Sequence, residues 1–274
     1  MIPVNNKLCS KMGYGMHSID TSNCIAHYSK LNNLANILHD KQLLIGSVSK
    51  LSDARESSMR WLDTIGYGHT SDITQQRKAE KLIKDAGMFL RVLCCASPKL
   101  NINGANPIEN AIYGRPRMWA QYGDNSNGFC VVLDKKVLGL EIRQHAQKTE
   151  HLIEDKVEYH DWLHLVSSSV CIEYGDGVGL TQSAFDVVSN NEMHRSIYFK
   201  KSKDWKGEEE YRYLLYRETC ENVFISIQKA VIGVVLGCNF PLNQFSQAKE
   251  YCNELGCECY ALNYSHPQYH LEKL

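Results

Sequence analysis

The charged segment 200–212 carries the densest group of side chains that could do chemistry. If residues 208–216 form a strand, its period of two places Glu208, Glu210 and Arg212 on one face. Charges on a strand inside a sheet are costly to bury unless they pair or line a cleft. Two interpretations stay open: an exposed edge strand with a solvated ion pair, or a site that cleaves a glycosidic bond. In such a site one carboxylate stabilises an oxocarbenium-like transition state, and the other orients or deprotonates an acceptor.

Four lysines and a tryptophan directly precede these carboxylates: Lys200, Lys201, Lys203, Trp205 and Lys206. Lysines at this density suit phosphate groups, and a tryptophan ring suits a stacked base. A charge run of this kind is equally typical of a solvated face. We expect four of the five to bind the substrate or a macromolecular acceptor: Lys200, Lys201, Lys203 and Trp205.

Polar side chains also gather where the first predicted strand ends. His27, Tyr28 and Ser29 lie at the end of a short apolar run that begins at Cys24. A polar group at the junction of a strand and a helix can face a ligand, and it can equally cap the helix or serve the core. These residues are therefore candidates for ligand binding that need support from elsewhere in the chain.

An aromatic pair forms the third group. Trp119 and Tyr122 are three residues apart on a short predicted helix, so they share one helix face. They are either core aromatics or a surface on which a flat ring such as nicotinamide stacks. Ser97 follows a buried strand upstream of this helix and is a further polar candidate.

The elements that must position these groups follow from the hydrophobic pattern. We expect one α+β domain at 23–274 after an N-terminal arm at 1–22. The predicted strands are 24–28, 43–45, 89–96, 129–133, 208–216, 223–227, 229–237 and 257–262. The predicted helices are 31–41, 74–86, 118–122 and 245–255, and the region 135–200 is expected to be rich in helix. Asp124 to Gly128 is a strong turn signal.

Composition limits the class of protein. The chain has 274 residues, 43% of them hydrophobic, and a net charge of −1. This excludes a polybasic protein whose nucleic-acid binding is visible in its composition. No secretory signal is visible, and no apolar stretch reaches the roughly 20 residues that cross a bilayer. Eleven cysteines, an odd number, argue against a secreted disulfide framework. We expect a cytoplasmic protein with no membrane segment.

The cysteines offer one possible metal site. Cys252, Cys257 and Cys259 precede His266 and His270, which are all residue types that bind zinc. Because the usual Cys-x2-Cys spacing is missing, we favour reduced, buried cysteines and expect no metal. The adjacent pair Cys94 and Cys95 is likewise expected to be buried and inert.

Taken in order, the motifs resemble a widespread bacterial domain of unknown function that is placed in the ADP-ribosyltransferase-like superfamily. The resemblance runs from about Cys24 to Gly237. It rests on His27-Tyr28-Ser29, Ser52-Asp53-x-x-Glu56, Cys95-x-Ser97, Met118-Trp119-x-x-Tyr122, Gly128-x-Cys130 and Trp205-x-x-Glu208-x-Glu210-Tyr211-Arg212. Ala96 and Ala54 depart from the family pattern. Ser52, Asp53 and Glu56 receive no specific role.

The resemblance implies an NAD-dependent mono-ADP-ribosyltransferase with NAD as its substrate. It implies a split pair of small antiparallel sheets with flanking helices around NAD. Its catalytic residues would be Glu210, Glu208 and His27. Its NAD-binding residues would be His27, Tyr28, Ser29, Ser97, Trp119, Tyr122 and Arg212.

The biological setting follows from the resemblance alone. Such an enzyme is commonly a toxin or an anti-phage effector with an inhibitor protein, and the acceptor is a macromolecule. The lysines slightly favour a nucleic acid over a protein as that acceptor. NAD hydrolysis and a non-catalytic binding module on the same fold are the alternatives.

Overall fold

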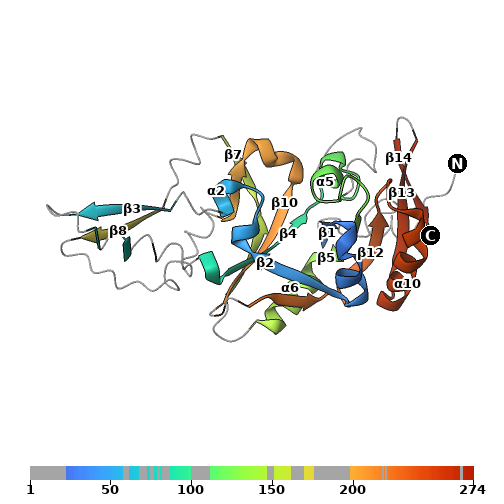
Figure 1. The fold of residues 1–274 in the computed structure, drawn as a ribbon, viewed down its shortest axis with the longest axis horizontal. Coiled ribbons are helices and arrows are strands. Elements are labelled where there is room, and N and C mark those ends of the chain that lie inside the picture. The colour runs from blue at the N-terminus through green and yellow to red at the C-terminus, as the bar shows by residue number, and fades with distance from the viewer. Residues whose placement is uncertain are drawn as a thin grey trace.

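The chain folds as a mixed α+β protein (Figure 1). The computed structural model describes residues 23–57, 62–67, 73–74, 77–78, 81, 87–99, 112–146, 151–161, 170–175, 198–217, 219, 221–265 and 268–274. The strands are β1 Cys24–Ser29, β2 Gln42–Ser47, β3 Leu62–Tyr67, β4 Leu90–Ala96, β5 Phe129–Asp134, β6 His151–Lys156, β7 Glu158–His160, β8 Val170–Gly175, β9 Lys200–Ser202, β10 Glu210–Tyr216, β11 Val223–Ser226, β12 Val231–Leu236, β13 Glu258–Ser265 and β14 Gln268–Lys273.

Short helices connect these strands. The α-helices are α2 Ala54–Ser57, α5 Pro116–Gln121, α6 Lys135–His145 and α10 Phe245–Leu255. The 3₁₀ helices are η2 Leu31–Asn33, η4 Val48–Lys50, η5 Lys203–Glu208 and η6 Leu242–Gln244, and η3 Ala35–His39 is a π-helix. Among the residues described, no helix combines the length and the apolar character needed to cross a membrane.

Ten strands form the main sheet, in the order β11-β2-β4-β1-β5-β12-β13-β14, with β10 on the other edge of β4 and β6 beyond it. β1 pairs with β5 over its whole length, but it pairs with β4 only at Ala26 and Ala96. Farther along the same strand, β2 takes over at Arg91 and Val92. The sheet is therefore almost divided between β1 and β4. Two short parallel pairs, β3–β8 and β7–β9, complete the strands, and Figure 1 shows β3–β8 extending away from the main sheet.

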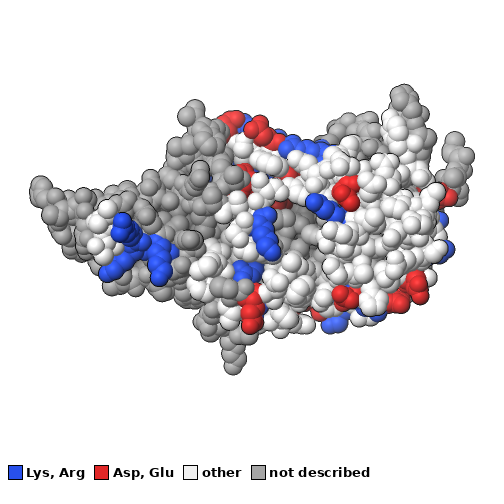
Figure 2. Space-filling model, viewed as in Figure 1, with Lys and Arg blue, Asp and Glu red and all other residues white. Residues whose placement is uncertain are grey.

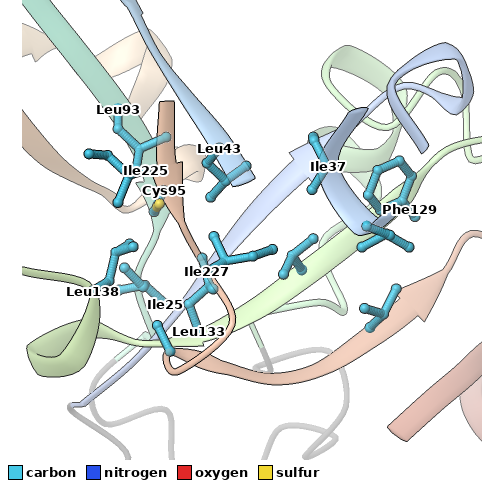
Figure 3. Packing of buried hydrophobic residues seen from close by; sticks show 14 of the residues in the cluster. Ile25, Ile37, Leu43, Leu93, Cys95, Phe129, Leu133, Leu138, Ile225 and Ile227 are labelled. Carbon is cyan, nitrogen blue, oxygen red and sulfur yellow. The ribbon is translucent and has the colours of Figure 1, made fainter. Parts of the chain in front are cut away.

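Alternation along the strands produces a core on each face of the sheet. Ile25, Leu93 and Phe129 belong to the larger core, whose packing Figure 3 shows. Ala26 and Ala96 point to the opposite face, in the smaller core with side chains from α5. β5 is buried on both faces, which is why its sequence is an uninterrupted apolar run.

Most of the predicted elements are confirmed, with differences in the helix 31–41, the last strand and the strand at 208–216. The predicted helix 31–41 is a 3₁₀ turn followed by a π-helix, and the side-chain amide of Asn33 in its first turn donates to the hydroxyl of Ser29. In the region 135–200, predicted to be rich in helix, the described residues form α6 and then mostly strands, while 147–150, 162–169 and 176–197 lie outside the described residues. The last strand continues to Ser265 and is followed by β14. The arm at 1–22 and most of the predicted helix 74–86 lie outside the described residues.

The predicted strand at 208–216 begins two residues later, at Glu210. Glu209 has a φ of 44°, in the left-handed region, so the chain turns there and cannot continue as an extended strand. Glu208 ends the 3₁₀ helix η5 and is not a strand residue. The prediction that period two aligns it with Glu210 is therefore wrong, and the two carboxylates meet through the turn.

We expect Gly128→Ala to lower the free energy of unfolding by about 1–3 kcal/mol, because a Cβ at this position would lie 2.1 Å from the carbonyl oxygen of Ser29. That oxygen is backbone and cannot swing aside. Gly46→Ala is the matched control, since a Cβ there meets nothing within 4 Å. Urea unfolding measures both variants, and an equal effect would show that the close approach of Gly128 to β1 is unimportant.

Candidate functional site

A cavity of about 270 Å³ lies where β1 and β4 diverge. Ala26 and Ala96, the one residue pair that joins these strands, are both in its wall. The complete lining is Ala26, His27, Tyr28, Lys50, Leu51, Ser52, Cys94, Cys95, Ala96, Met118, Tyr122, Lys201, Glu208 and Glu210. Segments far apart in the sequence thus meet around one hollow.

Six of the residues predicted from the sequence line this cavity: His27, Tyr28, Tyr122, Lys201, Glu208 and Glu210. The other seven do not: Ser29, Ser97, Trp119, Arg212, Lys200, Lys203 and Trp205. Eight residues that were given no role in the predicted site also reach the wall: Ala26, Lys50, Leu51, Ser52, Cys94, Cys95, Ala96 and Met118.

Arg212 forms the centre of a buried ion cluster behind the cavity. Its Nε and Nη2 donate to the two carboxylate oxygens of Glu210, at 2.8 and 2.7 Å. Its Nη1 and Nη2 donate to Glu56, and Nη1 also donates to the carbonyl oxygen of Tyr198 at 2.7 Å. All five N–H donors of the guanidinium are therefore used, with no exposed surface on the side chain. A lysine could not replace this planar fork.

Lys201 joins the remaining carboxylate to the cluster. Its Nζ lies 2.8 Å from Glu208 Oε2 and 3.2 Å from Glu210 Oε2, with Glu56 Oε2 at 3.8 Å. The Lys201 side chain is 4% exposed, and its ammonium stacks 4.7 Å from the centre of the Trp205 ring. Three carboxylates thus share two cations, an excess of one acid in a buried site.

Electrostatics keep Glu210 ionised. Burial alone would raise the pKa of Glu210, but the positive charges of Arg212 and Lys201 outweigh burial and lower that pKa to about 2. The pKa of Lys201 is raised, because the attraction of Glu210 and Glu56 exceeds the opposing effect of burial. At neutral pH Glu210 is an anion and Lys201 a cation. The pKa of Glu56 is raised by burial in spite of Arg212.

Tyr122 stands at the end of α5 and reaches the same cluster. Its hydroxyl donates to Glu208 Oε1 at 2.7 Å, which leaves the ring in the cavity wall. Burial and the negative charge of Glu208 raise the pKa of Tyr122, so it stays protonated and acts as a donor. Both oxygens of Glu208 are therefore fixed, one by Tyr122 and one by Lys201.

His27 lies at the division of the sheet. Its Nδ1 is 3.1 Å from the carbonyl oxygen of Cys94, on β4. Because a carbonyl oxygen only accepts, Nδ1 carries the proton. Burial lowers the pKa of His27 by more than this hydrogen bond raises it, so the ring is neutral at pH 7. Its Nε2 is then an acceptor at the cavity wall.

Four predicted ligand-binding residues serve the scaffold. Trp119 is 1% exposed and its indole N–H donates to the carbonyl oxygen of Tyr113, so of the two interpretations the core aromatic holds for Trp119. The hydroxyl of Ser29 accepts from Asn33, and that of Ser97 donates to the carbonyl oxygen of Glu209. Arg212 is fully enclosed by its protein partners. None of these four side chains lines the cavity, and each makes its contacts within the protein.

The lysines do not form one surface patch. Lys201 points into the protein, which corrects the expectation that it contacts phosphate on the surface. Lys203 is exposed and pairs with Asp161 at 2.6 Å. Trp205 lies between Lys201 and Arg117. On the face shown in Figure 2, the basic side chains of the described residues are scattered among acidic and uncharged ones.

The sequence signalled Glu56 without its role. Glu56 closes the motif Ser52-Asp53-x-x-Glu56, and the structure places its carboxylate against Arg212, 156 residues away in the chain. The signal that singles out this residue is its place in the motif, since the polar residues around it do not indicate that its carboxylate is buried. Nothing local in the sequence indicates which cation it would be.

The cysteine cluster shows no metal geometry in the part of the chain that the structure describes. No group of three or more His, Cys, Asp or Glu side chains there could hold a metal ion. Cys252, Cys257 and Cys259 form no disulfide, and the thiol of Cys252 interacts with those of the other two. His266 and the side chain of His270 lie outside the described residues.

Part of this site lies in a segment of the chain that is similar to a known protein family. The model of a family described as "Protein of unknown function (DUF2971)" matches residues 118–213. The chain is similar to this family over about a third of its length. The matched range contains Tyr122, Glu208 and Glu210 but neither His27 nor Glu56. No curated protein and no solved structure matches the chain. The match bears out the resemblance to a domain of unknown function over residues 118–213, short of the expected range from Cys24 to Gly237, and it assigns neither a superfamily nor an activity.

We expect Arg212→Leu to lower the free energy of unfolding by about 3–5 kcal/mol, because it leaves Glu56 and Glu210 buried without their main cation. Arg143→Leu is the matched control, since Arg143 pairs with Glu154 at the surface and such pairs contribute about 1 kcal/mol or less. Urea unfolding at pH 7 compares them. Similar losses in the two variants would contradict a buried cluster.

We expect the wild type to lose stability relative to His27→Asn as the pH falls below 6.5. The folded protein holds the pKa of His27 below this value, so the unfolded chain takes up the proton first. Above pH 6.5 both states are neutral and the difference is constant. The slope is at most about 1.4 kcal/mol per pH unit. Urea unfolding between pH 5 and 7.5 measures it, and a constant difference over this range would mean that His27 is not held neutral.

Proposed function

We propose that the protein transfers ADP-ribose from NAD to a macromolecular acceptor. One observation carries the proposal: His27, Tyr122, Glu208 and Glu210, from three separate parts of the chain, line one cavity. These four are among the nine residues that the resemblance to ADP-ribosyltransferase-like proteins assigns to NAD binding and catalysis. Their convergence was not required by their positions in the sequence.

The sheet supports the same proposal. The proposed fold is a pair of sheets that divide around NAD, and here the main sheet is joined between β1 and β4 by the pair Ala26 and Ala96 alone. The cavity lies at that junction. One half of the sheet brings His27 on β1, and the other brings Glu210 on β10.

The chemistry requires the C1′–N bond of the nicotinamide ribose to break. Its electron pair leaves with nicotinamide, and positive charge develops on the ribose. An ionised carboxylate held in place beside this ribose stabilises that charge, and Glu210 is such a carboxylate. The acceptor atom then bonds to C1′ and releases its proton.

The other residues of the cavity have supporting roles. Glu208, fixed by Tyr122 and Lys201, orients the acceptor or takes its proton. The neutral His27 offers Nε2 as an acceptor for a ribose hydroxyl. The Tyr122 ring is placed to pack on nicotinamide. Lys50 lies in the cavity wall but is exposed, which suits the diphosphate of NAD.

A nucleic acid is the proposed acceptor. Lys203 and Lys206 on η5 are exposed, and Lys200 is partly exposed on β9. They flank Trp205 in the sequence, and the Trp205 ring packs on the cavity residue Lys201. A single strand could contact these cations through its phosphates and the tryptophan through a base.

Incubation of the purified protein and a cell extract with NAD labelled in its adenosine half tests the proposal. Label on nucleic acid supports the reaction as proposed, and label on protein alone would contradict the acceptor. Free ADP-ribose with no labelled macromolecule would show hydrolysis in place of transfer. If no NAD is consumed, the proposal that the protein is an enzyme is wrong, and the interpretation as a non-catalytic binding module remains.

We expect Glu210→Gln to lower the turnover of NAD about 10²–10³-fold, because the change keeps the shape of the side chain and removes the stabilising charge. Glu158→Gln is the matched control: it makes the same change on an exposed side chain outside the cavity lining. Nicotinamide release gives the rates, and thermal unfolding confirms that both variants fold. Turnover close to wild type in a folded Glu210→Gln protein would end the assignment.

A further inference from the structure

Arg115 is a buried cation whose donors meet only backbone carbonyls among the described residues. It is 4% exposed. Its Nη1 donates to the carbonyl oxygen of Glu208 at 2.8 Å, and its Nη2 donates to that of Ser97. Its Nε is buried and has no hydrogen-bond partner. Burying a charge without an ion-pair partner is unfavourable, so stability alone is a poor reason for an arginine at this position.

Of the two carbonyls that Arg115 holds, that of Glu208 belongs to the turn that carries the two cavity carboxylates, and the other belongs to Ser97, which itself contacts this turn. The N–H and the hydroxyl of Ser97 both donate to the carbonyl oxygen of Glu209, each at 2.7 Å. Glu209 has a φ of 44°, a conformation that residues other than glycine rarely adopt. Arg115 and Ser97 together therefore restrain two successive carbonyls of a strained turn.

Arg115 also fixes the opposite side of the site. It is the residue before α5, and its carbonyl oxygen accepts from the N–H groups of Met118 and Trp119. α5 ends at Tyr122, whose hydroxyl donates to the side chain of Glu208. Arg115 is thus connected to Glu208 in two ways. Its side chain donates to the backbone carbonyl of Glu208, and its own carbonyl begins the helix whose last residues place Tyr122 against the Glu208 side chain.

We propose that Arg115 is a positioning residue that, together with Ser97, holds the turn at Glu209 so that Glu208 and Glu210 face the cavity in register with Tyr122. This inference rests on the proposed function for its catalytic meaning. The residue touches neither substrate nor the reacting atoms. It acts through the backbone of the residues that do.

Arg115→Met tests the inference, with Arg91→Met as the matched control. Arg91 is a second buried arginine, 3% exposed, whose Nε and Nη1 also donate to backbone carbonyls, those of Glu221, Met88 and Leu90, away from the cavity. We expect Arg115→Met to lower kcat for NAD about 10²-fold, as a displacement of reacting groups by about 1 Å can do, with little change in KM. Arg91→Met should keep the wild-type kcat even where it lowers the unfolding midpoint.

Hydrogen exchange supplies a readout that does not need activity. In Arg115→Met the amides of Ser97 and of residues 206–212 should exchange faster, while those of β12 keep the wild-type rate. Arg91→Met should leave 206–212 unchanged. Ser97→Ala keeps the backbone hydrogen bond to Glu209 and removes the one from the hydroxyl. It should raise amide exchange at 206–212 and lower kcat, each by less than Arg115→Met does. This variant replaces Arg115→Met in the test if Arg115→Met does not fold.

The outcomes separate the two proposals. If the wild type does not consume NAD, the proposed function fails. The rate of amide hydrogen exchange at 206–212 in Arg115→Met still decides whether Arg115 holds the turn. Exchange that rises equally throughout the protein, or a kcat that falls as much in Arg91→Met as in Arg115→Met, would overturn the positioning role.

Discussion

The guanidinium of Arg212 lies between the carboxylates of Glu56 and Glu210 with no solvent contact, and the candidate site depends on this arrangement. Each N–H donor has an acceptor, so the buried charge is fully compensated by hydrogen bonds. The interaction ties α2, the backbone at Tyr198 and β10 together. It also fixes the rotamer and the charge of Glu210, the carboxylate in the cavity wall. Removing Arg212 or one of the two carboxylates would leave the other charge buried without a partner, which is strongly destabilising because that charge has lost its hydration.

A second layer of contacts depends on the first. Once Arg212 satisfies Glu210 and Glu56, a single cation remains for Glu208, and Lys201 is shared between Glu208 and Glu210. The cluster keeps one more carboxylate than cation. In a buried site of low dielectric constant this excess favours any positive charge that enters the cavity. The proposed chemistry uses the excess at the moment when charge develops on the ribose.

Local patterns in the sequence predicted part of this arrangement. Apolar runs located β1, β4, β5 and β12, and the order of polar motifs indicated that His27, Tyr122 and Glu210 belong to one site. The turn at Glu209 was not predictable, because a left-handed glutamate has no sequence signal and is imposed by Ser97 and Arg115. The partner of Glu56 was not predictable either, since it lies 156 residues away. Lys201 and Lys203 look alike in the sequence, yet Lys201 is buried on β9 and Lys203 is exposed at the first position of η5.

The central claim is that the buried acid excess attracts the positive charge of the nicotinamide ring. Isothermal titration calorimetry of the wild-type protein with NAD and with NADH tests it most directly, because the two ligands differ in the charge of this ring and share the rest of their structure. The account predicts that NAD binds more tightly than NADH at equal pH and salt concentration. Equal affinity, or tighter binding of NADH, would contradict it.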